Sequence, residues 1–273
     1  MIAIENISFG YTKKKFLFKD FSFTQESGNI IGLLGENGAG KSTLLKIISG
    51  LLHVKQGKIV VNNTKPIQRE PDFLSDIFLV DDTPFLPSLT IKTYLAVYGA
   101  LYKNFDFDKM HHLLASFQLT ENQKLHKISH GQQKKFIIAF ALSTNCKLLL
   151  LDEPTNGLDI PSKKIFRKVL IESVTENQTV IISTHQVKDV ENVIDKIVQI
   201  ADGKIVFEQE TFKITEKYQF QNVSSIANLE NVKYYEKNPF GYKVIVPVAN
   251  NEETEIDIEL LFNAIANKAE INL

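Results

Sequence analysis

Residues 35–43 could bind a phosphate group. The stretch GENGAGKST fits the pattern G-x-x-x-x-G-K-[ST], and it lies between an apolar run at 30–34 and helical spacing over 42–52. Glycines let such a loop curl so that N–H groups point at phosphate oxygens, and the following helix adds its partial positive end. We expect Lys41 to hold the β- and γ-phosphates of a nucleotide and Ser42 to coordinate Mg²⁺.

A glycine turn that only caps a helix is the alternative interpretation of this loop. The glycine spacing does not fit the dinucleotide pattern G-x-G-x-x-G. The predicted phosphate-binding residues are Gly35, Glu36, Asn37, Gly38, Ala39, Gly40, Lys41, Ser42 and Thr43.

Two adjacent carboxylates, Asp152 and Glu153, end a run of four leucines. Neighbouring side chains on a strand face opposite sides, and strand ends of parallel sheets are where ligands bind. Asp152 could therefore ligate Mg²⁺ while Glu153 polarises a water toward the γ-phosphate; a solvated strand end is the alternative. His185 follows the next apolar strand. A histidine there is by itself more often structural, but its place after the acidic pair favours a γ-phosphate contact.

Strands and helices must alternate to position these side chains. Apolar runs and helical spacing predict strands at 2–9, 17–24, 30–34, 58–61, 148–151 and 180–183, and helices at 42–52, 91–101, 110–117 and 162–174. This order implies an α/β fold with a mostly parallel sheet that is covered on both faces. A mainly helical region spans about 84–146.

Residues 212–273 form a distinct C-terminal region in the sequence. They carry more acidic than basic side chains, whereas residues 1–211 carry a slight basic excess. The pattern predicts a hairpin over 232–246 with its turn at 238–241, followed by a helix at 259–267. We expect a small α+β accessory region.

Composition excludes several classes of protein. The 273 residues are 44% hydrophobic with a net charge of −1, so a basic surplus typical of nucleic-acid binding is missing and no nucleic-acid partner is expected. Apolar runs fall far short of the roughly 18 to 20 residues that cross a bilayer. The N-terminus lacks the features of a secretory signal, and the single Cys146 fits a reducing compartment, so we expect a cytoplasmic protein.

Together these motifs resemble the nucleotide-binding subunit of an ABC transporter. Residues 128–132, ISHGQ, are similar to the family signature LSGGQ, and they lie between the phosphate loop and the acidic pair, with Gly157-Leu158-Asp159 and then His185 further on. The resemblance covers about residues 1–210. It implies a P-loop ATPase core, an antiparallel β element at the N-terminus and an inserted helical subdomain, so that 1–211 would be the ATP-binding domain.

The resemblance also implies roles for individual residues. Tyr11 matches the aromatic residue that stacks on adenine, although an ordinary strand-end tyrosine is the alternative. Glu153 and His185 match the general base and the γ-phosphate sensor. Asp159 matches the loop that links two active sites. The signature residues that would bind the nucleotide of a facing subunit are Ser129, Gly131 and Gln132.

Two positions depart from the family pattern. Asp81 stands where the family usually carries a glutamine that touches Mg²⁺, and we expect its carboxylate to reach the metal. His130 replaces the first glycine of the signature. Its ring could point away harmlessly, or it could make the facing site slower or pH-sensitive.

The resemblance implies an ATPase that uses ATP and Mg²⁺ to power transport. The chain carries one phosphate loop and one signature. In this family each ATP site combines the loop of one subunit with the signature of another, so two sites form only when the chain pairs head-to-tail with a second ATP-binding subunit. The helical region looks most like that of bacterial multidrug exporters, with apolar residues over 84–98 that would dock an integral membrane permease or pack the subdomain core, placing the subunit on the inner face of the membrane. A soluble ABC ATPase that acts on nucleic acid or ribosomes, or a small-molecule kinase, are the alternatives.

Overall fold

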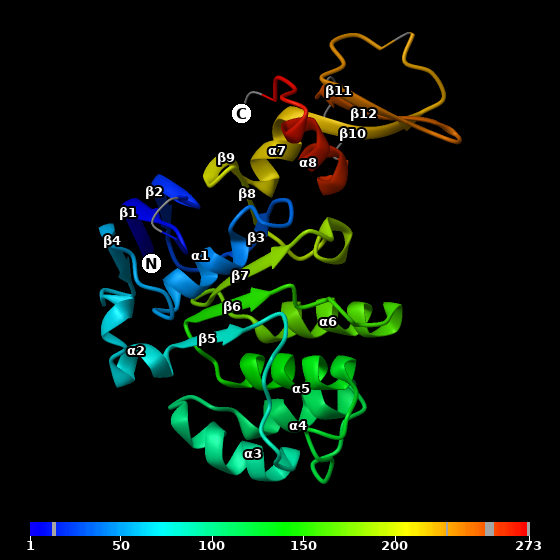
Figure 1. Cartoon of the computed structure of the whole chain (residues 1–273). Coiled ribbons are helices and arrows are strands. Elements are labelled where there is room, and N and C mark those ends of the chain that lie inside the picture. Colours follow the sequence, from blue (N-terminus) through cyan, green and yellow to red (C-terminus); the bar gives the residue numbers. More distant parts are fainter. Residues whose placement is uncertain (13–14, 228, 249–253, 272–273) are drawn as a thin grey trace.

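A six-stranded sheet forms the centre of the molecule (Figure 1). The computed structural model describes residues 1–12, 15–227, 229–248 and 254–271. The strand order is β5-β6-β7-β3-β8-β9, and all neighbours are parallel except the β8/β9 pair. These strands are β3 (Ile30–Leu34), β5 (Ile77–Val80), β6 (Leu148–Asp152), β7 (Thr179–Thr184), β8 (Lys196–Ala201) and β9 (Lys204–Glu210). The predicted mostly parallel α/β fold is thus confirmed.

Strand β6 shows why the central strands are apolar throughout. Leu149 and Leu151 belong to a core shared with the helical region, whereas Leu148 and Leu150 belong to a second core on the opposite face. Both faces are covered, so alternation of polar and apolar side chains disappears.

The register of the sheet brings the ends of three strands to one edge. Leu34 of β3 is opposite Thr184 of β7, and Ser183 is opposite Asp152 of β6. The residues that follow these strands therefore emerge close together, as expected for parallel strands.

An antiparallel N-terminal sheet packs over the second core. Its order is β2-β1-β4, with β1 (Ile2–Phe9), β2 (Phe18–Gln25) and β4 (Gln56–Val61). Helix α1 (Lys41–Ile48) lies between this sheet and the central one, with Leu44 and Leu45 in the shared core.

Helix α1 is shorter than the predicted 42–52. Gly50 has a left-handed φ of 72°, and a Cβ atom there would lie 2.1 Å from the carbonyl oxygen of Pro66. The chain turns away at this point, so Leu51 is 53% exposed instead of joining the apolar face.

Helices α3, α4 and α5 form the predicted helical region, below the sheet in Figure 1. Tyr94, Phe136 and Phe140 meet in its interior, with ring centroids 5.1 Å apart for Tyr94 with each phenylalanine. The helices between β4 and β7 are η1 (Pro66–Gln68), α2 (Pro71–Ser75), α3 (Ile91–Tyr98), η2 (Gly99–Leu101), α4 (Phe107–Ser116), α5 (His130–Ser143) and α6 (Ile160–Ser173).

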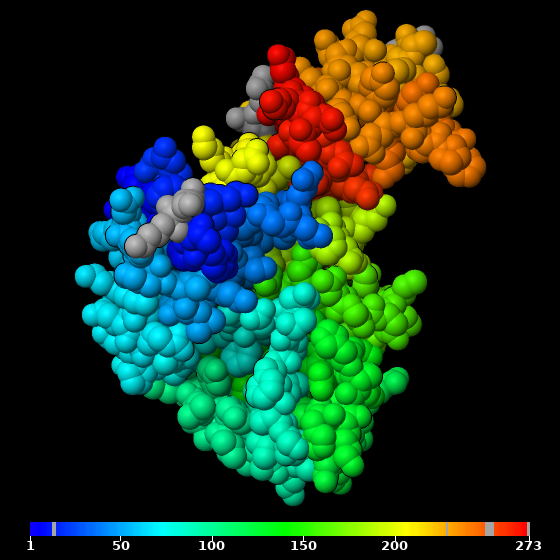
Figure 2. Space-filling view, viewed as in Figure 1, coloured from blue at the N-terminus to red at the C-terminus, as the bar shows by residue number. Residues whose placement is uncertain are grey.

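The C-terminal part forms a third, antiparallel sheet with order β10-β12-β11. Its elements, with the short helix η3 that precedes β8, are η3 (Val187–Asp189), α7 (Thr211–Lys217), β10 (Tyr218–Val223), β11 (Tyr234–Asn238), β12 (Gly241–Pro247) and α8 (Ile258–Ala266). The predicted hairpin and final helix are confirmed, whereas β8, β9, α7 and β10 had no sequence prediction. Figure 2 shows this part as a lobe beyond the main body.

Helix α8 anchors that lobe to the chain just beyond β7. Lys188 pairs with Glu259 at 2.6 Å, and Glu191 Oε1 accepts a hydrogen bond from the Ile258 backbone N–H at 2.7 Å.

None of the helices in the described ranges is long and apolar enough to cross a membrane.

Candidate nucleotide-binding site

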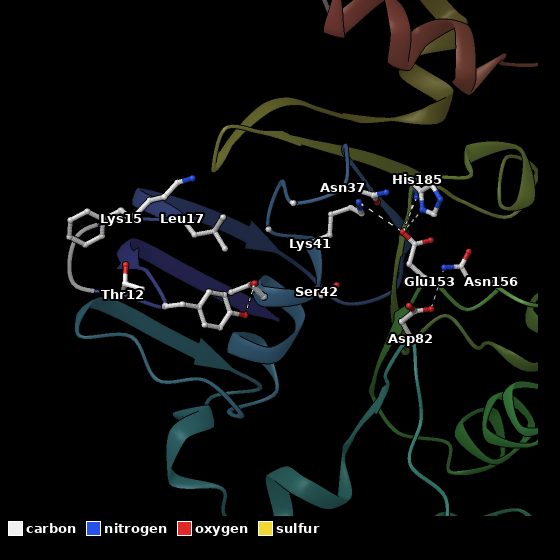
Figure 3. Close-up of a pocket in the computed structure, with 15 residues that line it drawn as sticks. Thr12, Lys15, Leu17, Asn37, Lys41, Ser42, Asp82, Glu153, Asn156 and His185 are labelled. Atoms are coloured by element: carbon white, nitrogen blue, oxygen red, sulfur yellow. Dashed lines mark hydrogen bonds and ion pairs between the residues drawn. The ribbon is translucent and has the colours of Figure 1, made fainter. Parts of the chain in front are cut away.

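A cavity of about 630 Å³ opens at the edge where the central strands end (Figure 3). It brings together the loop after β1, the phosphate loop with the start of α1, and the segments that follow β5, β6 and β7. The lining residues are Tyr11, Thr12, Lys15, Phe16, Leu17, Asn37, Gly38, Gly40, Lys41, Ser42, Thr43, Asp82, Glu153, Asn156 and His185.

The phosphate loop wraps around the Lys41 side chain. The Lys41 ammonium donates to the carbonyls of Gly35 at 2.7 Å and Glu36 at 3.1 Å. Gly40, which precedes α1, has a φ of 109°, and a Cβ atom there would lie 2.7 Å from the Phe18 ring, so a larger residue would not fit.

Enclosure of the Lys41 ammonium changes its acid–base behaviour. Desolvation lowers the pKa of Lys41, and the nearby carboxylates of Glu153 and Asp152 partly oppose this shift. The ammonium lies 4.0 Å from Glu153 Oε1. The loop thus presents a buried positive charge together with the N-terminus of α1, which is an anion-binding arrangement.

The predicted phosphate-binding residues form this loop and the first turn of α1, but not all of them line the cavity. Asn37, Gly38, Gly40, Lys41, Ser42 and Thr43 do. Gly35 and Glu36 contribute carbonyls to Lys41, and the Ala39 N–H donates to the Glu36 carbonyl at 3.2 Å.

Glu153 is held by several donors at once. Its Oε1 atom is 2.7 Å from Nδ1 of His185 and accepts from the His185 backbone N–H at 3.1 Å, while Oε2 accepts from the Thr184 hydroxyl at 3.2 Å. Its φ of 44° is rare for a residue with a side chain and marks a constrained backbone. The carboxylate is therefore fixed at the cavity wall.

Asp152 points to different partners from Glu153, as predicted for neighbouring strand residues. It is 2% exposed, and its Oδ1 atom accepts a hydrogen bond from the Ser183 hydroxyl. Asp152 is not among the residues that line the cavity, but its carboxylate is close enough to Lys41 to oppose the lowering of the lysine pKa.

Asp82, not the predicted Asp81, is the aspartate after β5 that lines the cavity. Asp81 lies outside the lining, with Oδ2 3.2 Å from the Lys46 ammonium. Asp82 Oδ1 accepts from the Asn156 amide at 3.3 Å (Figure 3). Sequence reasoning missed Asp82 and Asn156. Both stand within three residues of a predicted site residue, and this nearness was the only signal for them.

Tyr11 lines the cavity beside the start of α1. The side chain is 67% exposed, and its hydroxyl is 2.9 Å from Thr43 Oγ1. The Tyr11 ring also contacts Phe9 edge-on, with centroids 5.2 Å apart. An exposed aromatic ring is thus held in the lining of the same cavity as Lys41 and Glu153.

The signature residues lie at the start of α5, outside the cavity lining. Ser129 caps this helix: its hydroxyl accepts from the Gln132 N–H at 3.3 Å, and Gln132 Oε1 accepts from the Ser129 N–H at 3.1 Å. A Cβ atom on Gly131 would lie 2.9 Å from the Gly157 carbonyl, and one on Gly157 would lie 3.2 Å from Nδ1 of His130. The start of α5 and the loop at Gly157 therefore pack closely.

Asp159 caps helix α6 beside this contact. Its Oδ1 atom accepts from the Ser162 N–H at 3.0 Å, and the hydrogen bonds from Ser162 lower the pKa of Asp159.

The two arginines of the chain donate hydrogen bonds to backbone carbonyls and do not line the cavity. Arg69 donates to the Gly50 carbonyl at 3.4 Å, and Arg167 donates to the Asp189 carbonyl at 3.3 Å.

Fold and site together define a P-loop nucleotide hydrolase, in which a glycine-rich loop and a strand-end carboxylate face one cavity. The ABC transporter family model matches residues 18–156. The chain belongs to this family. It is an ATP-binding, ATP-hydrolysing subunit for transport through separate membrane subunits.

Relatives include both export and import subunits. The chain is 37% identical over 191 residues to the cytochrome c biogenesis ATP-binding export protein CcmA of Reclinomonas americana, covering 67% of this chain and 84% of that protein. It is 31% identical over 242 residues to the molybdate import ATP-binding protein MolC of Haemophilus influenzae, covering 86% and 90%. A dimeric bacterial ABC transporter cassette superposes with a TM-score of 0.67 at 24% identity, covering 77% of this chain and 98% of that one.

Proposed function

We propose that the cavity between Tyr11 and Glu153 binds ATP and that Glu153 is the general base for its hydrolysis. The observation that carries this proposal is the Lys41 ammonium, which lies inside the phosphate loop and 4.0 Å from a carboxylate fixed by His185. The loop and Lys41 would hold the phosphates, and Tyr11 would stack on the base.

The residues around the phosphate loop suit Mg²⁺. This ion prefers oxygen ligands and is bound by one or two carboxylates together with substrate phosphates and waters. Ser42 and Asp82 present oxygens to the cavity, and Asp152 lies close to Lys41. Ser42 and Asp152 would hold the ion, with Asp82 as the third candidate in place of Asp81. Bound there, Mg²⁺ neutralises charge on the phosphates.

Hydrolysis would depend on positioning and charge. Glu153 would take a proton from a water placed between its carboxylate and the γ-phosphate. His185 keeps that carboxylate in place and, next to the same phosphate, would contact its oxygens. Lys41 would stabilise the charge that develops on the transferred group.

A head-to-tail pair would complete the site. Ser129, Gly131 and Gln132 lie outside the cavity of their own chain and present the capped N-terminus of α5, which is suited to an anion. In a pair, these residues would face the nucleotide of the partner, and Asp159 would lie between the two sites. The similarity to a dimeric cassette supports this arrangement.

The helical region of residues 84–146 would dock the permease. Phe85 is 94% exposed, and Val97 and Leu101 are also more than half exposed, whereas Tyr94 and Leu95 pack the core. The predicted apolar segment thus divides between packing and surface. The subunit would sit on the cytoplasmic face of the membrane through this contact and would power export, which is the function in the name of its relative, the export protein CcmA.

The chain would divide into two units at about residue 211. Residues 1–211 would form the ATP-binding domain, and residues 212–273 a small accessory region whose helix α8 is tied to the segment after His185.

The Glu153→Gln variant tests the role of Glu153. We expect it to bind ATP, to hydrolyse it at least about a hundredfold more slowly, and to form a dimer stabilised by ATP that size-exclusion chromatography detects. Glu121→Gln is the matched control, because Glu121 also pairs with a histidine, His111, at 2.7 Å but on the exposed surface. Hydrolysis by Glu153→Gln at the rate of the control would refute the assignment.

Lys41→Ala tests the phosphate loop, with Lys103→Ala as control because Lys103 is an exposed lysine paired with Asp72 at 2.6 Å. Loss of ATP binding in the first variant alone is expected.

Recovery of the tagged chain from solubilised membranes should bring an integral membrane protein with it. RNA or DNA recovered instead would contradict the transporter function.

A further inference from the structure

Lys134 is a lysine of α5 whose side chain is completely buried. It lies five residues beyond Ser129, on the first turns of the signature helix, and its relative exposure is 0%. A buried ammonium is costly unless hydrogen bonds and opposite charge surround it. Desolvation lowers the pKa of Lys134, and the carboxylate of Asp82 is the largest influence that opposes the shift.

The Lys134 ammonium contacts the backbone on both sides of the proposed active site. It donates to the carbonyl of Asp82 at 2.5 Å, to that of Glu153 at 3.2 Å and to that of Asp81 at 3.4 Å. It also lies 3.5 Å from Asp82 Oδ1. One side chain therefore holds the segment after β5 and the segment after β6 together.

The contact with Glu153 falls at a constrained position. Glu153 has a left-handed φ of 44°, and its carboxylate depends on the backbone orientation to reach His185. A hydrogen bond to the Glu153 carbonyl restrains the peptide that sets this orientation. Loss of that bond would release the strained backbone locally.

The helix that carries Lys134 is itself fixed. The capping box of Ser129 and Gln132 closes its first turn, and Phe136 and Phe140 are fully buried in the core beneath. Displacement at the start of α5 would therefore be transmitted to the ammonium and through it to both carbonyls.

We propose that Lys134 is a positioning residue that links the signature end of α5 to the backbone of Glu153 and Asp82. In this role it sets the orientation of the general base according to the position of the signature helix, which in a pair faces the other nucleotide. The inference rests on the proposed function of Glu153.

A comparison of the fully buried Lys134 with the half-buried Lys109 tests this role. Lys134→Met keeps the unbranched, apolar part of the side chain and removes its charge and donors. Lys109→Met is the matched control, because the Lys109 ammonium also donates to backbone carbonyls, those of Ser173 at 3.1 Å and Leu142 at 3.4 Å, and none of these residues lines the cavity. Both variants should lower Tm.

The two variants should differ in catalysis. We expect Lys134→Met to lower kcat by about tenfold to a hundredfold while KM for ATP stays within about threefold, because the phosphate loop is untouched. Lys134→Arg should restore much of kcat, since a guanidinium can donate to the same carbonyls. Lys109→Met should keep the wild-type kcat in its folded fraction. Equal kcat in Lys134→Met and Lys109→Met would overturn the proposal.

Lys134→Gln provides the measurement if the methionine variant does not fold, with the same expected split between kcat and KM. Failure of this inference is distinguishable from failure of the proposed function. If wild-type protein hydrolyses ATP and Glu153→Gln forms the ATP-stabilised dimer, a normal kcat for the Lys134 variants refutes only the role of Lys134.

Discussion

Nδ1 of His185 lies 2.7 Å from Oε1 of Glu153, and the backbone N–H of His185 donates to the same oxygen at 3.1 Å. The pair comes from the ends of two adjacent parallel strands, β7 and β6. A single carboxylate oxygen is thus fixed by both the ring and the main chain of one residue. The contribution of the His185 ring can therefore be measured apart from that of its backbone N–H, because substitution of the side chain leaves the backbone donor in place.

His185→Ala should reduce hydrolysis without removing it. The ring contact with Glu153 is lost, but the Thr184 hydroxyl and the backbone N–H still hold the carboxylate. We expect kcat to fall by about tenfold to a hundredfold, with ATP binding retained, as measured by steady-state kinetics and nucleotide titration.

His111→Ala is the control for this variant. His111 forms a pair with Glu121 at the same 2.7 Å distance on the exposed surface of the helical region. Its loss should leave kcat unchanged. A kcat for His185→Ala equal to that of the control would show that the histidine does not act in the reaction.

Sequence alone predicted the parts of the fold that repeat a simple pattern. The buried runs of β3, β6 and β7 and the loop between β3 and α1 were located within one or two residues. Parallel strands buried on both faces have little choice of side chain, and the phosphate loop has a fixed order of glycines. The strands and the loop that surround the proposed site could therefore be predicted from the sequence.

Features that depend on tertiary contacts could not be predicted from the sequence. The end of α1 depends on the close approach of Gly50 to Pro66. Likewise, Asp82 lines the cavity whereas Asp81 pairs with Lys46. Two adjacent aspartates in an extended segment are equivalent in sequence. Only the neighbours in space distinguish them.

Asp82→Asn and Asp81→Asn should therefore differ. Asp82 lines the cavity, so its loss should raise the Mg²⁺ concentration for half-maximal activity and lower kcat by about tenfold. Asp81→Asn removes a partly exposed ion pair with Lys46 and should change both values by less than about threefold. Titration of ATPase activity with MgCl₂ measures this. The larger effect in Asp81→Asn would identify Asp81, as predicted from the sequence, as the metal ligand.

Tyr11→Ala should weaken ATP binding. A stacked base contributes about 1 to 3 kcal/mol, so the Kd for ATP should rise by about fivefold to 150-fold. Tyr11→Phe keeps the ring and loses only the hydroxyl contact with Thr43, so it should bind nearly as well. Tyr235→Ala removes a half-exposed ring of the C-terminal sheet and is the control. Equal affinity for Tyr11→Ala and Tyr235→Ala would contradict stacking.

Glu191→Gln should change the pH dependence of stability. Desolvation raises the pKa of the half-buried Glu191, although the Ile258 N–H partly opposes this shift. A raised pKa means that the folded state favours the protonated carboxyl. The stabilising contribution of the proton is present at low pH and is lost as pH rises through the folded-state pKa.

The glutamine variant keeps an oxygen that can accept from Ile258 and carries no charge to desolvate. We expect its Tm at about pH 8 to equal or exceed that of the wild type, with the advantage disappearing toward about pH 4. Glu259 of α8 is a partly exposed glutamate that pairs with Lys188. Glu259→Gln is the control and should show no such pH-dependent gain. A Tm difference that stays constant from pH 4 to 8 would show that Glu191 ionisation does not control the attachment of α8.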